Sequence, residues 1–151
     1  MKLIFIIFSL FINVNICNQS ANIDEVRSVF LSCEGNIVSI QKLIDLTKNE
    51  LVNETIIVYN STANLMILDF MYNPLKKYLS FNKYTKVIDS IIEMNPSNIE
   101  IRLLRYIIQK KSPEILSYNK NIFSDSLYVV KNMKGLEQNF LSYLKILIKS
   151  F

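Results

Sequence analysis

Apolar residues recur every three or four positions along most of the chain, which is the spacing of one face of an α-helix. The first stripe follows Asn22-Ile23-Asp24-Glu25, a sequence typical of a helix N-terminus with a capping box. It consists of Val26, Val29, Phe30 and Cys33. After Gly35-Asn36, the same spacing continues over Ile37, Ile40, Leu43 and Ile44. These two stripes predict a pair of short helices that pack as a hairpin.

Two longer helices are predicted in the middle of the chain. The first runs over about 53–71, and one of its faces carries Ile56, Tyr59, Asn60, Ala63, Ile67 and Phe70. Asn73-Pro74 interrupts the pattern, and proline is favoured at the first position of a helix. The next helix therefore begins at Pro74 and stops before Pro96. Its apolar positions are Leu75, Tyr78, Leu79, Val87, Ile88, Ile91 and Ile92.

The sequence Ser97-Asn98-Ile99-Glu100 predicts a capping box at the start of a fifth helix. In such a box the Ser97 hydroxyl accepts from the Glu100 amide, and the Glu100 carboxylate accepts from the Ser97 amide. The helix that follows shows Ile101, Leu104 and Ile108 on one face. A sixth helix with Leu127, Val130 and Met133 on its apolar face ends at Gly135, and a seventh begins at Leu136.

The low number of turn-forming residues decides the fold class. The chain has 2 glycines and 3 prolines in 151 residues, too few for the many turns of an all-β domain. No segment has the pattern of a strand. We therefore predict a single all-α domain over residues 22–151, built of about seven short antiparallel amphipathic helices.

The N-terminus has the layout of a secretory signal peptide. Lys2 precedes an apolar run from Leu3 to Ile12, which only Ser9 interrupts. This run is shorter than the ~20 residues of a membrane-spanning helix. We expect residues 1–21 to be removed after Ser20-Ala21, which gives a secreted or periplasmic protein with no stable transmembrane segment. Lipidation of Cys17 is the alternative, although Ile16 stands where a small residue is normally required.

Several kinds of chemistry are excluded by composition. The chain has no histidine and 2 cysteines, so we expect no histidine-based catalysis, no metal site and no disulfide framework. No glycine-rich loop could cradle a phosphate, so no cofactor is expected. The net charge is +4, but the basic residues are scattered, which argues against a nucleic-acid partner. Cys33 lies on an apolar stripe and is expected to be a small buried hydrophobe. The chain is therefore not expected to be an enzyme.

One polar constellation is a candidate binding site: Lys76, Lys77, Tyr78, Glu100, Arg102 and Arg105. In one interpretation Glu100 caps its helix, and the arginines pair with acids on a neighbouring helix, such as Asp69 or Asp89. In the other, the arginines form a shallow surface that binds a carboxylate of a partner peptide. Exposed tyrosines would line that surface: Tyr72, Tyr78, Tyr84 and Tyr118.

The segment from Lys83 to Arg105 resembles the second helix of a tetratricopeptide repeat that continues into the next repeat. The link Asn95-Pro96-x-Asn98 matches the proline that separates such repeats, and Asn73-Pro74-x-Lys76-Lys77 and Ser112-Pro113 to Tyr118-Asn119 extend the pattern. As a whole, the chain resembles an uncharacterised family of small secreted or envelope helical proteins of bacteria. The resemblance implies helical hairpins and no particular activity. Tyr72, Tyr84 and Ile91 occupy positions that are small in a full repeat, so a regular repeat array is not expected.

Two functions remain open from the sequence. The first is a protein–protein interaction or scaffold module of the cell envelope, which binds another envelope or secreted protein. The second is a small-ligand or lipid carrier with an apolar pocket between its helices. A carrier needs a continuous apolar cavity, whereas an interaction module needs a filled core and an exposed groove.

Overall fold

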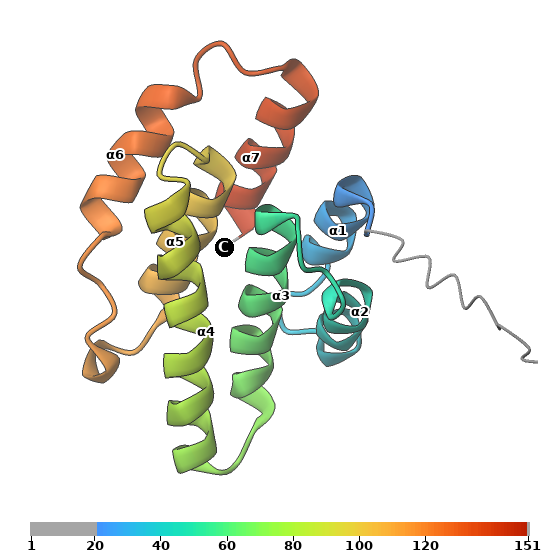
Figure 1. Cartoon of the computed structure of the whole chain (residues 1–151), viewed down its shortest axis with the longest axis vertical. Coiled ribbons are helices and arrows are strands. Elements are labelled where there is room, and N and C mark those ends of the chain that lie inside the picture. Colours follow the sequence, from blue (N-terminus) through green and yellow to red (C-terminus); the bar gives the residue numbers. More distant parts are fainter. Residues whose placement is uncertain (1–20, 151) are drawn as a thin grey trace, which may run out of the picture.

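A computed structural model describes residues 21–150 as an all-α structure, which confirms the predicted fold class. The predicted signal peptide and Cys17 lie outside the described residues, apart from Ala21. Seven α-helices and two 3-10 helices make up the described part (Figure 1). They are α1 (Ile23–Phe30), α2 (Ile37–Thr47), α3 (Glu54–Met66), η1 (Ile67–Phe70), α4 (Pro74–Met94), α5 (Ile99–Lys111), η2 (Glu114–Leu116), α6 (Ile122–Asn132) and α7 (Gln138–Ser150).

Asparagine side chains start most of these helices. The helices α1, α2, α3, α4 and α5 each begin after an asparagine whose side-chain oxygen accepts from one or two amides of the first turn. This cap satisfies backbone donors that have no partner inside the helix. The five asparagines are Asn22, Asn36, Asn53, Asn73 and Asn98. Local sequence thus places the helix starts, and the predicted start of α4 at Pro74 is confirmed.

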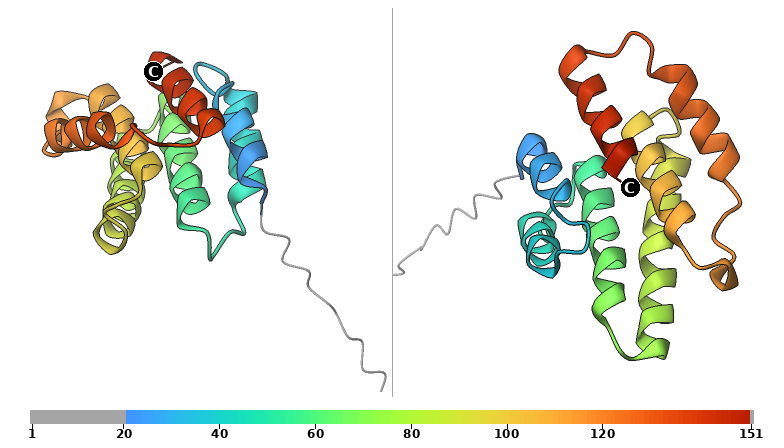
Figure 2. Two further views of the ribbon diagram at one scale, coloured as in Figure 1. Left: turned by 90° about the horizontal axis from the view of Figure 1, so that it is seen from above. Right: turned by 180° about the vertical axis from the view of Figure 1, so that it is seen from behind.

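Helix α3 lies at the centre of the fold and packs against α1, α2, α4 and α5 (Figures 1 and 2). Its central position explains why it buries residues on almost every side. Tyr59 is fully buried and meets Phe30 of α1 edge to face, with ring centroids 5.0 Å apart. Cys33 is buried in the turn after α1, as the sequence predicted. The third predicted helix is shorter than expected, because its last turn tightens into η1.

Helices α6 and α7 both pack against α5, and side chains of α7 also reach α1 and α3 (Figure 2). The predicted apolar face of α6 was wrong for Leu127 and Val130, whereas Met133 packs against the core. Leu127 is 57% exposed and Val130 is 67% exposed, whereas Asp125 and Val129 are buried. An ion pair of Asp125 with an arginine of α5 turns the helix this way, because a buried carboxylate must face its partner.

The predicted capping box of α5 was also wrong. Asn98 is the cap, and its side-chain oxygen accepts from the amides of Glu100 and Ile101, each at 3.1 Å. The Ser97 hydroxyl instead donates to Asn95. The Glu100 carboxylate turns into the core, where Arg27 and Tyr59 bind it. Two buried donors compete for this carboxylate more strongly than one exposed amide.

Replacing Asn98 by alanine is therefore expected to lower the free energy of unfolding by about 1 kcal/mol, within the ~0.5–2 kcal/mol typical of lost caps. Asn98 also donates to Thr55 of α3, so this loss lies toward the upper end. The matched control is Ser97→Ala, which removes only an exposed contact and should leave stability nearly unchanged. Urea unfolding of both variants checks the assignment, and equal losses would contradict it.

Within the described residues, none of the helices has both the length and the apolar character that crossing a bilayer requires.

Candidate functional site

The described residues contain two buried polar networks and one apolar cavity. The first is the Glu100 network, which consists of Glu100 and its partners Arg27, Tyr59 and Tyr143. Arg27 of α1 binds the carboxylate with two parallel hydrogen bonds, at 2.9 and 2.7 Å. The Tyr59 hydroxyl donates to the same carboxylate at 2.6 Å and also bonds the hydroxyl of Tyr143 on α7. Helices α1, α3, α5 and α7 thus meet at one carboxylate.

Hydrogen bonds and burial raise the pKa values of the three partners of Glu100. The hydrogen bonds from Arg27 to Glu100 raise the pKa of the guanidinium, which outweighs the lowering by burial. Burial raises the pKa of Tyr59 well above 10, and the negative charge of Glu100 adds to that rise. Burial likewise raises the pKa of Tyr143. The pKa values of these three partners therefore lie away from neutral pH, with Arg27 charged and both tyrosines neutral.

The second network, the Asp125 network, surrounds the fully buried Asp125 of α6. Arg105 of α5 donates to both oxygens of this carboxylate, at 2.7 and 2.9 Å. Its third nitrogen reaches Asp89 of α4 at 3.1 Å, and Tyr118 also donates to Asp89. Arg102 lies 3.6 Å from Asp125. The sequence interpretation that pairs an arginine with Asp89 is thus confirmed, whereas Asp125 was not foreseen as the main partner.

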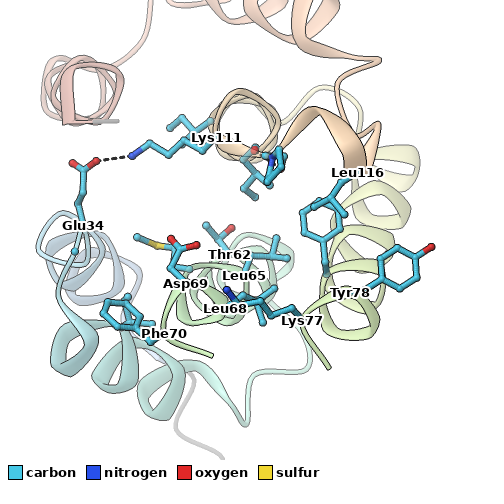
Figure 3. Close-up of a pocket in the computed structure, with 18 of the residues that line it drawn as sticks. Glu34, Thr62, Leu65, Leu68, Asp69, Phe70, Lys77, Tyr78, Lys111 and Leu116 are labelled. Carbon is cyan, nitrogen blue, oxygen red and sulfur yellow. Dashed lines mark hydrogen bonds and ion pairs between the residues drawn. The ribbon is translucent and has the colours of Figure 1, made fainter. Parts of the chain in front are cut away.

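The cavity lies between α3, η1, α4, α5 and η2 (Figure 3). We call it the α3–α5 cavity. Its volume is about 530 Å³. Its walls are mostly apolar and include Phe30, Leu65, Leu68, Phe81, Ile108 and Leu116. The charged side chains that line it are Glu34, Asp69, Lys77 and Lys111. A space of this size and character suits a small organic molecule.

The cavity lies beside the first turns of α4, which contribute Pro74, Lys77, Tyr78 and Phe81 to its lining. Further along α4, Arg105 of the Asp125 network donates to Asp89 and so joins α5 to α4. Near the start of α4, Pro74 and Tyr78 line the space, and η2 covers part of its far side. The ion pair of Glu34 with Lys111, at 2.5 Å, joins the turn after α1 to the end of α5 beside the cavity.

The predicted site residues fall into two separate places. Lys77 and Tyr78 line the α3–α5 cavity, and Lys76 lies exposed in the same turn of α4. Arg102 and Arg105 belong instead to the Asp125 network. Arg105 meets α4 at Asp89, about three helical turns or ~18 Å along the axis from Lys77. The five residues therefore do not form one continuous surface.

The predicted tyrosines are also dispersed. Tyr72 is fully exposed beside the start of α4, and Tyr84 is half-buried further along that helix. Tyr118 is half-buried and packs edge to face on Phe81, at 5.6 Å between ring centroids. Sequence reasoning offered an apolar pocket as one alternative but did not locate it, since an apolar helix face looks the same whether it meets a helix or an empty space.

Cys33 is the cysteine in the described part of the chain, and it is buried. Burial raises the pKa of the Cys33 thiol to about 11, so the reactive thiolate is not populated at neutral pH. The thiol donates to the carbonyl of Val29. Within the described part of the chain, no three acidic or cysteine side chains come together to hold a metal ion.

Comparison of the chain with models of protein families, with curated proteins and with solved structures finds no match to any of them.

Proposed function

We propose that this protein is an exported, non-catalytic carrier that binds a small apolar ligand in the α3–α5 cavity. The observation that supports the proposal is the cavity itself, because a volume of about 530 Å³ lies within the ~300–1,000 Å³ of ligand pockets. A protein whose helices only supported one another would gain stability by closing such a space. A continuous apolar cavity is also the feature that distinguishes a carrier from an interaction module.

Binding of a neutral fluorescent probe tests this proposal. N-phenyl-1-naphthylamine is apolar and uncharged, and its emission increases when it enters a dry pocket. We expect saturable binding by the wild-type protein. Leu116→Trp should weaken it, because Leu116 lines the cavity and the larger ring occupies part of the space.

The matched control is Leu127→Trp, which adds the same ring on the exposed face of α6, away from the cavity. Circular dichroism establishes that both variants keep their helices. Wild-type protein that binds no probe, or two variants that lose binding equally, would contradict the proposal.

Export belongs to the same proposal and rests on the N-terminal sequence. A secreted or periplasmic protein should begin near Asn22 after cleavage. N-terminal sequencing of the protein recovered from outside the cytoplasm checks this expectation. A product that still begins at Met1 would contradict it, and a lipidated Cys17 would indicate a membrane-anchored carrier.

A second candidate function is a protein–protein interaction or scaffold module of the cell envelope. It is supported by a separate observation: Phe123, Leu127 and Val130 are exposed at helical spacing along α6. Exposed apolar stripes of this kind mark contact surfaces. A photocrosslinker at position 127 should then capture one defined envelope protein in cells, whereas the same group at Asn132, which is exposed on another side of the helix, should capture less of it. Equal capture at both positions would count against this function.

A further inference from the structure

We propose that the ligand of the α3–α5 cavity is an amphiphile with a negatively charged end, and that Lys77 binds this end. The inference rests on the proposed carrier function and goes beyond it by assigning a ligand class and an anchoring residue. It follows from the charges that surround an otherwise apolar space.

The four charged side chains at the cavity are not equivalent. Glu34 and Lys111 neutralise each other in an ion pair at 2.5 Å. In Figure 3 this pair and Lys77 lie on different sides of the opening. Asp69, on η1, is exposed to solvent, whereas Lys77 is half-buried. Asp69 and Lys77 therefore remain outside the Glu34–Lys111 ion pair, and the less exposed of these two residues is the positively charged one.

Lys77 has no internal partner to account for its position. Its ammonium makes no hydrogen bond and no ion pair within residues 21–150. The aliphatic stem of a half-buried lysine packs along apolar surface, while its ammonium stays accessible at the edge of that surface. A carboxylate or similar anion at the end of an apolar ligand would bind this ammonium while its hydrocarbon part fills the cavity.

The surroundings of Lys77 favour an anion further. The first turn of α4 contains no acidic residue but two lysines, Lys76 and Lys77. Cations are unfavourable at this positive end of a helix dipole, and an anion relieves the repulsion. Asp69 acts in the opposite direction, because its carboxylate repels an anion at the same opening. Removal of Asp69 and removal of Lys77 should thus have opposite effects.

The test compares two ligands that differ only in their end group, dodecanoate and dodecanol, as competitors of N-phenyl-1-naphthylamine. The pH is set so that the fatty acid is ionised. We expect wild-type protein to prefer dodecanoate. Lys77→Met keeps the aliphatic stem and should weaken dodecanoate binding about tenfold, the effect of one charge-assisted contact, while dodecanol binding is unchanged.

Two variants serve as controls. Lys76→Met removes the neighbouring charge, which does not line the cavity, and should retain most of the preference for dodecanoate. Asp69→Asn should strengthen the binding of dodecanoate. If dodecanoate and dodecanol compete equally well, and Lys77→Met changes neither, the anionic ligand class is wrong while the carrier function stands. If the neutral probe does not bind at all, both proposals fall.

Discussion

Replacing Asp125 by alanine is expected to lower the free energy of unfolding by about 3–5 kcal/mol, the largest effect of any single substitution considered. Asp125 is fully buried, and both of its oxygens accept from Arg105. Removal of the carboxylate leaves the guanidinium of Arg105 almost buried with only Asp89 as a partner, which is 35% exposed. A domain of this size has about 5–15 kcal/mol of stability in total, so this loss is a large fraction of it.

Urea unfolding measures this loss, and a double variant separates its cause. In Arg105→Met with Asp125→Leu, both charges are replaced by apolar groups, and much of the stability should return. Asp89→Asn should be less harmful than Asp125→Ala, because water can reach Asp89. If the double variant is no more stable than Asp125→Ala, the loss does not come from an uncompensated charge.

Replacing Glu100 by alanine is expected to have the second largest effect, a loss of about 3 kcal/mol. The substitution removes the acceptor of Arg27 and of the Tyr59 hydroxyl at once. It also weakens one contact of α7, because the Tyr59 hydroxyl that bonds Tyr143 loses its carboxylate partner. Arg27 would keep only Asp24 and the faces of two rings of α7, Phe140 and Tyr143.

The matched control is Asp24→Ala, which removes the other acidic partner of Arg27. The Asp24 side chain is 83% exposed, so its ion pair is screened by water and should contribute little. Hydrogen exchange gives a second measurement. Amides of α7 should exchange faster in Glu100→Ala than in Asp24→Ala, and equal exchange would show that the Glu100 network does not hold α7.

Helix positions could be predicted from the sequence because their causes are local. A cap acts over three residues, and an apolar stripe can be read within one helix. Asn73-Pro74 predicted the start of α4, and the first and last helices were likewise anticipated. The prediction was wrong where a distant residue competed for a local group. Glu100 left its predicted cap for Arg27, a partner 73 positions away in the chain.

The candidate site could be predicted only in part, for the same reason. Lys77 and Tyr78 were singled out, and both line the cavity. Nothing in the sequence separated them from Arg102 and Arg105, which serve the Asp125 network. The face of α6 illustrates this point, because Leu127 and Val130 suit a core face by composition. A single buried carboxylate at position 125 outweighed both, since an unpaired buried charge costs more than the exposure of two aliphatic side chains.

The sequence by itself determined that this protein is helical, where most helices begin, and which catalytic and metal-binding chemistries lack the necessary residues. These properties depend on residue types and on spacings of a few positions. Only the tertiary structure decided which polar residues pair and where the packing leaves an open space. Hydrogen bonds and cavities depend on how whole helices approach one another. Helix α6, for example, is rotated so that its buried Asp125 faces Arg105 of α5.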